Sequence, residues 1–313
     1  MISFPFGFYT VFFTSLSQTF TASTPVPSVQ IFLGPLVQAV PIGGSIGSIF
    51  AAACVVYAAM LLLATLQGSS LPRSMRRAFA DGPGALFSNT LLATLLSMGF
   101  LYFTILVIDT VETSGGIPVG GLSGDAMNLF ASLTIAPLRE EFGFRVLIIG
   151  TAAFLVSIAR PAGPTLRAFW RPSASYEGVQ RVGAPWAVIG FALLASSVMF
   201  GLLHIISGSG WEIGKLPEAT FAGVVLGYLY IRYGFHVAVL VHWGIDYFGS
   251  VFAFFGQGVY GIPWTADNGY ILQNVAVLDL VVLGLASFLL VVYLGLRHYL
   301  RERSESAALG VEV

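Results

Sequence analysis

Long, continuous runs of hydrophobic positions dominate the chain. They lack the two-residue alternation of membrane barrel strands, so they predict α-helices, and a helix needs about 20 mostly apolar residues to cross a bilayer. The run at 217–231 is short and is expected to be a tilted or partial span, whereas the run at 126–158 is long and carries charges in its middle. The predicted spans lie near 46–67, 85–108, 126–158, 186–206, 217–231, 234–255 and 271–296.

Residues 3–20 form a weaker, eighth candidate, which Pro5 and Gly7 interrupt. This segment has neither the basic start nor the small-residue cleavage site of a signal peptide, so we expect an uncleaved membrane segment. Ala22–Ser28 is expected to be a loop. The pattern therefore predicts an all-α, polytopic transmembrane helix bundle of seven or eight spans, with residues 1–313 forming a single transmembrane domain.

Composition supports the membrane class and excludes others. Charged residues make up 9% of the chain, against roughly 25% in soluble domains, and the first of them is Arg73. This is too little polar surface for a soluble globule and too little charge for disorder. The net charge of −1 gives no basic excess, so we expect membrane lipid rather than nucleic acid as a partner. Cys54 is the only cysteine, which excludes an internal disulfide and a thiolate zinc cluster.

The distribution of basic residues predicts the orientation. Positively charged side chains are favoured in cytoplasmic loops. Most of the lysines and arginines fall in four regions outside the predicted spans, namely Arg73–Arg77, 159–185, Arg232 and Arg297–Arg303. Assigning these regions to the cytoplasm makes 159–185 a cytoplasmic loop and puts the C-terminus in the cytoplasm. We expect an integral protein of the cell membrane.

Two pairs of glycines have the spacing that allows close helix contact in lipid. They are Gly43 with Gly47 and Gly223 with Gly227, each four residues apart. We interpret both pairs as packing features.

The predicted span 126–158 contains four charged side chains near its middle: Arg139, Glu140, Glu141 and Arg145. A charge in the hydrocarbon core costs about 2.5–3.5 kcal/mol even on the lenient scale, so retained charges indicate a use. Glu141 and Arg145 are four residues apart in the favourable order for an ion pair. Glu140 points about 100° away and is free to face a cavity, where one of two adjacent acids can exchange a proton. A purely structural buried ion pair is the alternative.

Two histidines lie within other predicted spans. His204 lies in a stretch, 182–211, that lacks Asp, Glu, Lys and Arg. His242 and Asp246 are one helical turn apart on one face, where an aspartate can fix the tautomer of the histidine or share a metal with it. Taken alone, His204 is better explained as a packing histidine, whereas His242 with Asp246 is equally compatible with a functional and a packing role.

Together these residues resemble a known family. Glu-Glu-x-x-x-Arg (140–145), Phe-x-x-x-His (200–204) and His-x-x-x-Asp (242–246) occur in this order on three hydrophobic segments, and Phe221–Tyr230 also matches the family's pattern. The set resembles the CPBP family of intramembrane proteases, which includes the type II CAAX prenyl endopeptidases. The resemblance covers roughly 130–255, and we expect the catalytic core at 126–255.

The resemblance implies peptide-bond hydrolysis within the membrane. It assigns the positioning and deprotonation of a water molecule to Glu140 and His204. His242 and Asp246 take the role of stabilising the oxyanion, while Glu141 and Arg145 support the site. The implied substrate is a membrane-associated or prenylated, CAAX-type peptide or protein.

The chemistry of the residues leaves two points open. An ionised Asp246 only accepts hydrogen bonds, whereas the family often has asparagine at this position. Asp246 therefore acts either in its protonated form or by orienting His242. Hydrolysis without a cofactor is favoured, but Glu140, His204 and His242 are also a ligand set that a divalent metal such as zinc accepts.

The predicted site carries a geometric requirement. Glu140 lies about 21 Å along its helix from the outer end, whereas His204 is close to the outer end of its own span. The two can meet only if the fourth span extends toward Trp211 or if the helices tilt strongly. The rival functions are a non-catalytic membrane scaffold or bacteriocin-immunity type binding protein, and a transporter, since intramembrane acids also form proton relays.

Overall fold

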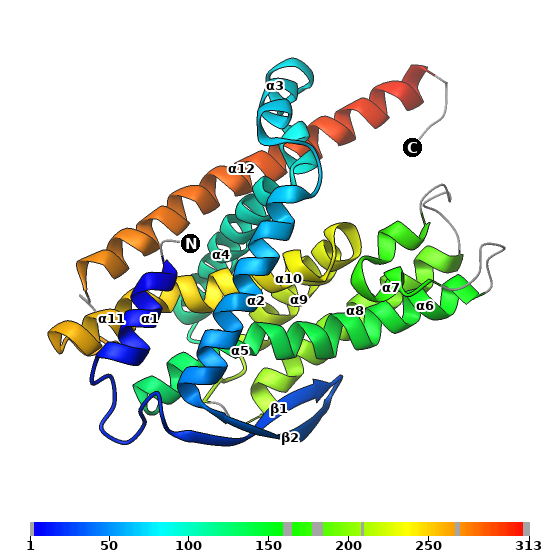
Figure 1. The fold of residues 1–313 in the computed structure, drawn as a ribbon. Coiled ribbons are helices and arrows are strands. Elements are labelled where there is room, and N and C mark those ends of the chain that lie inside the picture. The colour runs from blue at the N-terminus through cyan, green and yellow to red at the C-terminus, as the bar shows by residue number, and fades with distance from the viewer. Residues whose placement is uncertain (1–2, 159–164, 177–183, 208–209, 267–269, 309–313) are drawn as a thin grey trace.

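A computed structural model describes residues 3–158, 165–176, 184–207, 210–266 and 270–308. In this part of the chain the fold is a bundle of helices with one β-hairpin beside it (Figure 1). The elements are α1 (Ser3–Phe13), β1 (Pro25–Leu33), β2 (Leu36–Ser45), α2 (Ile46–Leu66), α3 (Leu71–Asp81), η1 (Pro83–Ser88), α4 (Thr90–Ser114), α5 (Ala126–Glu141), η2 (Phe142–Gly150), α6 (Thr151–Ile158), α7 (Arg167–Trp170), η3 (Pro172–Tyr176), α8 (Ala184–Ile206), α9 (Lys215–Tyr233), α10 (Phe235–Trp243), η4 (Gly244–Phe248), α11 (Gly249–Tyr260) and α12 (Ile271–Ala308).

Helix α10 is the centre of the bundle. Every residue from His236 to Trp243 is buried, and α2, α4, α5 and α9 surround the helix. A helix that is hydrophobic on all sides is stable only when other helices cover it completely. Its last turn carries His242, so the sequence places this imidazole in the interior of the protein.

Two of the long membrane helices contain a π-helical segment. The helix Ala126–Ile158 is α-helical up to Glu141, π-helical in η2 and α-helical again in α6. The helix Phe235–Tyr260 changes in the same way at η4, which contains Asp246. Such segments are rare and occur frequently at functional sites. Both lie next to acids that the sequence analysis singled out.

The polytopic helical bundle is confirmed. Within the described ranges, six helices are long and apolar enough to cross a membrane, namely Ile46–Leu66, Thr90–Ser114, Ala126–Ile158, Pro185–Ile206, Phe235–Tyr260 and Ile271–Arg301. Helix α9, over the predicted span 217–231, does not meet this criterion. It nevertheless runs antiparallel to α8, because Gly201 lies against Thr220 while Gly227 lies against Leu193. The predicted total of seven or eight spans is not confirmed.

The first 45 residues differ from the sequence patterns in two ways. The candidate span at residues 3–20 is not one continuous helix, because α1 ends at Phe13 and its 11 residues extend only about 16 Å. Ala22–Ser28 is only partly a loop, since β1 begins at Pro25 and pairs antiparallel with β2. The hairpin turns at Gly34, where φ is +63°, a conformation that glycine adopts without a steric cost.

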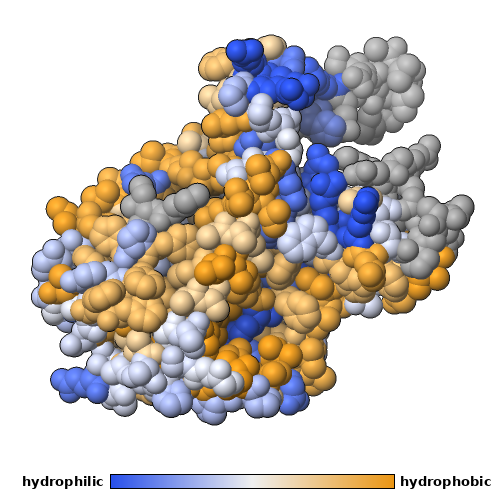
Figure 2. All heavy atoms as spheres, in the orientation of Figure 1, coloured by the Kyte–Doolittle hydropathy of each residue, from blue (hydrophilic) through white to orange (hydrophobic). Residues whose placement is uncertain are grey.

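The face drawn in Figure 2 is largely hydrophobic, as expected for a protein surrounded by lipid. Hydrophilic side chains gather at the top of this view around α3, which carries Arg73, Arg76 and Arg77. A small hydrophilic area surrounded by hydrophobic side chains lies above the hairpin.

The glycine pairs have different roles. Gly223 and Gly227 lie at the contact of α9 with α8, where a Cβ on Gly223 would lie 2.8 Å from the Ser197 Cα atom. Close helix contact at this pair is confirmed. Gly43 belongs to β2 and has open space around it, so the helix-packing interpretation of Gly43 with Gly47 is wrong.

Gly223→Ala is expected to destabilise the protein by about 1–3 kcal/mol, because the added methyl group meets the backbone of α8. Gly190→Ala is the matched control, since it also adds one methyl group in a helix but has open space at that position. Thermal unfolding of the detergent-solubilised variants measures the difference. Equal or higher stability of Gly223→Ala relative to Gly190→Ala would contradict the packing that we describe.

Candidate active site

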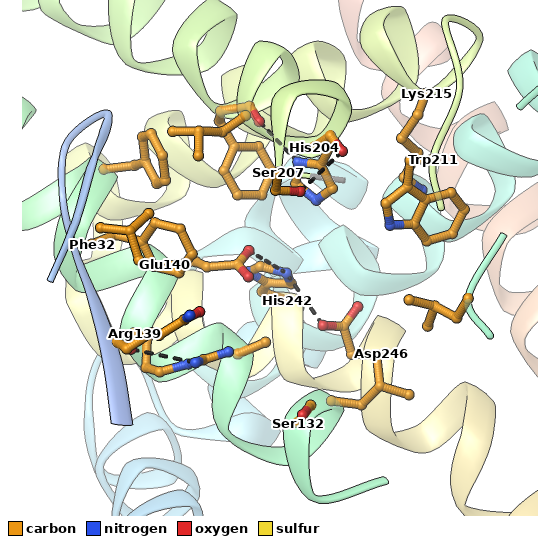
Figure 3. Close-up of a pocket in the computed structure, with 18 of the residues that line it drawn as sticks. Phe32, Ser132, Arg139, Glu140, His204, Ser207, Trp211, Lys215, His242 and Asp246 are labelled. Atoms are coloured by element: carbon orange, nitrogen blue, oxygen red, sulfur yellow. Dashed lines mark hydrogen bonds and ion pairs between the residues drawn. The ribbon is translucent and has the colours of Figure 1, made fainter. Parts of the chain in front are cut away.

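A cavity of about 430 Å³ lies between the hairpin, α5, the end of α8, the start of α9 and the end of α10 (Figure 3). Its walls are mostly apolar and come from β1, β2, α5 and α8. The titratable side chains that line it are Arg139, Glu140, His204, Lys215, His242 and Asp246.

An ion pair lies directly behind the cavity. Glu141 and Arg145 are both fully buried, and Glu141 Oε2 lies 3.0 Å from Arg145 Nε. The pair joins the last turn of α5 to the π-helical segment η2. Two buried ions stabilise a protein only if further polar partners compensate for their lost hydration.

Those partners come from α8 and α10. Arg145 Nη1 donates to Ser196 Oγ at 3.4 Å, and the guanidinium carbon lies 4.7 Å from the centre of the Phe200 ring. Ser196 in turn donates to the carbonyl of Phe144 at 2.8 Å. The other carboxylate oxygen of Glu141, Oε1, pairs with His242 Nδ1 at 2.9 Å. The ion pair thus links three helices.

His242 connects the buried pair to the cavity. Its Nδ1 atom faces Glu141, while its Nε2 atom lies 3.4 Å from Asp246 Oδ2 and 3.8 Å from Glu140 Oε2. Figure 3 shows the imidazole between the Glu140 and Asp246 carboxylates. An ionised Glu141 is an acceptor only, so Nδ1 carries a proton and the ring orientation is fixed.

The cluster balances its charges when His242 is protonated. Three carboxylates and three cationic groups then lie in or directly behind the cavity, so their formal charges cancel. These six groups are Glu140, Glu141, Asp246, Arg139, Arg145 and His242.

His204 and Glu140 remain accessible from the cavity. The Nδ1 atom of His204 lies 2.8 Å from the carbonyl oxygen of Phe200 one turn earlier. Because a carbonyl only accepts, Nδ1 is the donor, and Nε2 of the neutral ring is left as an acceptor. The Glu140 side chain is 15% exposed. Figure 3 shows both side chains at the same cavity, with His204 across from Glu140.

The two residues border the same cavity although the fourth span is not longer than expected. Helix α8 ends at Ile206 and does not continue toward Trp211. The helix Ala126–Ile158 has 33 residues, about 50 Å, which exceeds the roughly 30 Å of the hydrocarbon core. It crosses α2 obliquely (Figure 1). The oblique course allows the middle of this helix to meet the end of α8.

All six predicted site residues are therefore close together. Glu140, His204, His242 and Asp246 line the cavity, while Glu141 and Arg145 support it from behind. Their individual roles in catalysis stay predictions.

Sequence reasoning missed the part of the cavity outside 126–255. Gln30, Phe32 and Val37 of the hairpin line it, and Arg139 Nη1 donates to the Gln30 carbonyl at 3.3 Å. The Gly34-Pro35 dipeptide was the available signal, because glycine at the first position of a two-residue turn is typical of hairpins. Lys215, which lies between the predicted spans 186–206 and 217–231, also lines the cavity, and its ammonium lies 4.1 Å from the centre of the Trp211 ring.

The alternative metal set was also compared with the geometry. Among the described residues, no group of three or more histidine, cysteine, aspartate and glutamate side chains is arranged to hold a metal ion. Glu140, His204 and His242 thus line one cavity without forming a ligand cluster in this structure.

The comparisons with known proteins agree with the site. Residues 123–248 match the family model described as type II CAAX prenyl endopeptidase Rce1-like. This segment contains all six predicted site residues. Neither a curated protein nor a solved structure matches the chain.

Arg145→Met is expected to destabilise the protein by about 3–5 kcal/mol, because it leaves the buried Glu141 carboxylate without its cation. The double variant Glu141→Gln/Arg145→Met removes both charges and is expected to recover part of this loss. Thermal unfolding in detergent measures both. If Arg145→Met alone is as stable as the unmodified protein, the ion pair is not the structural support of the site.

Proposed function

Because the chain belongs, through residues 123–248, to the Rce1-like type II CAAX prenyl endopeptidases, which are membrane-embedded hydrolases, we propose that it cleaves a membrane-associated or prenylated peptide. The attacking water is activated by Glu140 and His204. One observation carries this proposal: the two side chains face a common cavity, and neither is enclosed by a protein partner that would exclude water.

Glu140 is the proposed general base. Its carboxylate accepts a proton from the water as the oxygen attacks the peptide carbonyl. His204, with Nε2 as an acceptor, holds the second hydrogen of the same water and so fixes the direction of attack. The proton on Glu140 then passes to the leaving amine, which completes the cleavage.

His242 and Asp246 are proposed to act on the oxyanion. The Nε2 atom of His242 faces the cavity, and in the protonated ring it is a donor to the developing negative charge. Asp246 lies 3.4 Å from the same atom. This geometry supports the interpretation in which Asp246 orients His242 over the one in which it binds the oxyanion itself.

The apolar walls support a lipid-linked or hydrophobic substrate. Phe32, Phe144, Phe200 and Leu203 line the cavity beside the polar group. Apolar lining with a few convergent polar groups is typical of sites that bind hydrophobic ligands. The proposed catalytic core remains 126–255, with the C-terminus of the chain in the cytoplasm of a cell-membrane protein.

The structure favours this function over a scaffold or an immunity-type binding protein. In a scaffold the polar side chains would satisfy each other and close the space between them. Here Glu141 and Arg145 are closed off, but Glu140, His204 and Asp246 border an open volume. A transporter would show discontinuous spans around a midplane site, whereas both π-helical segments continue as helices on either side.

Glu140→Gln and His204→Ala are each expected to lower cleavage of a farnesylated CAAX-type peptide by about 10²–10⁴-fold, the usual contribution of general acid–base groups. Asp279→Asn is the control, because Asp279 is a carboxyl residue of α12 that is exposed and does not line the cavity. Activity is measured with the purified protein in lipid nanodiscs, with circular dichroism as the folding check. Full activity in either cavity variant rejects the mechanism.

Cleavage by protein depleted of metal with a strong chelator is expected to equal that of untreated protein. The reason is that Glu140 and His204 activate the water without a Lewis acid in the proposed mechanism. Loss of activity that added Zn²⁺ restores would instead favour the metal-dependent alternative at Glu140, His204 and His242.

A further inference from the structure

The β-hairpin forms one wall of the cavity, beside two helices that are long and apolar enough to cross a membrane. The turn of the hairpin packs against these two helices. A Cβ atom added to Gly34 would lie 3.6 Å from Ile148 Cδ1 and 3.8 Å from Met199 Cε. Ile148 is ten residues, about 15 Å, from the end of its helix at Ile158, and Met199 is seven residues, about 10 Å, from Ile206. The tip of the hairpin is therefore level with the interior of two membrane helices.

The composition of the hairpin suits this depth. Residues 25–45 contain no charged side chain, and the tip exposes Leu33, Leu36 and Val37 by 42%, 68% and 45%. A soluble hairpin with this surface would be prone to aggregation. Surrounded by lipid, the same side chains are in a favourable environment.

One edge of the hairpin is covered and the other is open. Arg139 donates to the Gln30 carbonyl, so Gln30 directs its backbone groups away from β2 and toward α5. Antiparallel partners point their backbone groups outward at every second pair. Gln30 pairs with Ala39, and Phe32 pairs with Val37. Ala39 and Val37 therefore direct their N–H and C=O groups toward the outer edge of β2.

This outer edge lacks backbone partners in the part of the chain that the structure describes. The Ala39 carbonyl accepts a hydrogen bond from the side chain of Gln38 at 3.2 Å. The N–H groups of Val37 and Ala39 have no hydrogen-bond acceptor among the described residues. In hydrocarbon each unsatisfied backbone group costs several kcal/mol, and open sheet edges are avoided there. The open stretch is short, because Pro41, the next outward-pointing position, has no N–H to offer.

We propose that the outer edge of β2, Leu36–Val40, binds the main chain of the peptide substrate as a third strand. This inference rests on the proposed function, and it names how the substrate is held. Strand addition satisfies the Val37 and Ala39 amides with carbonyls of the substrate. Val37 lines the same cavity as Glu140 and His204, so a strand on this edge borders that cavity.

Strand addition also provides hydrogen-bond partners for the backbone of an extended substrate. A peptide in a membrane satisfies its backbone groups by forming a helix, and a helix hides the carbonyl that water must attack. Unwinding it in lipid leaves N–H and C=O groups without partners. An open strand edge beside the cavity replaces those partners and keeps the scissile bond extended.

The test compares Ala39→Pro with Ala39→Val in the full chain, in nanodiscs, in a Glu140→Gln background that prevents turnover. Proline removes only the outward amide and is tolerated on edge strands, whereas valine keeps the amide. The probe is a fluorescent peptide with a farnesylated cysteine followed by three residues. Ala39→Pro is expected to raise its Kd about 3- to 10-fold, the effect of one hydrogen bond, and Ala39→Val to leave it unchanged.

A second series leaves the hairpin intact. Probes with a single ester in place of one backbone amide are scanned along the peptide, since an ester carbonyl is a weaker acceptor. At one position, the ester is expected to weaken binding of the probe to the Ala39→Val protein and to leave its binding to the Ala39→Pro protein unchanged. Equal affinities at every position, or equal binding by the two folded variants, overturn the proposal.

Two further outcomes are distinct from these. If Ala39→Pro changes the oligomeric state in light scattering but not probe binding, the edge pairs with a second copy of the chain and the proposal is wrong. If the unmodified protein neither binds nor cleaves the probe, the proposed function fails and this inference fails with it. Cleavage by the unmodified protein together with unaltered binding by Ala39→Pro rejects the inference alone.

Discussion

Pairing of charge inside a hydrophobic bundle is the constraint on which the rest of the structure depends. Glu141 and Arg145 are completely buried, and neither would be tolerated without the other. Ser196, Phe200 and His242 complete the pair, so that α8 and α10 must approach η2. The contacts that stabilise these two ions are thus the contacts that bring His242 to Glu140 and create the cavity.

The two adjacent acids have different surroundings as a result of this arrangement. Glu141 faces inward and pairs with Arg145 and His242, whereas Glu140, one residue earlier, faces the cavity. A helix turns about 100° per residue, so neighbouring side chains necessarily face different surroundings. One acid serves the architecture and leaves the other free for chemistry.

Much of the bundle and of the site was predictable because membrane helices leave strong traces. Long apolar runs marked α2, α4 and α12, and the cost of charge in lipid singled out Glu140 and Arg145. The hairpin was not predicted, because an uncharged strand in lipid loses the polar alternation by which strands are recognised. The sequence left a longer fourth span and a strong helix tilt as alternatives for bringing His204 to Glu140, because tilt is set by packing against neighbouring helices and not by the length of a hydrophobic run.

The π-helical segments change which side chains of the two helices face the lipid and which face the core. A π turn closes its hydrogen bond one residue later than an α turn, so each such turn rotates everything downstream relative to an uninterrupted helix. A helical wheel drawn from Ala126 onward describes the face of α5 correctly and then assigns wrong faces to α6 after Gly150. The same holds for α11 after Phe248. Lipid-facing and core-facing positions in the two halves of these helices therefore have to be phased separately, each from its own side of the interruption.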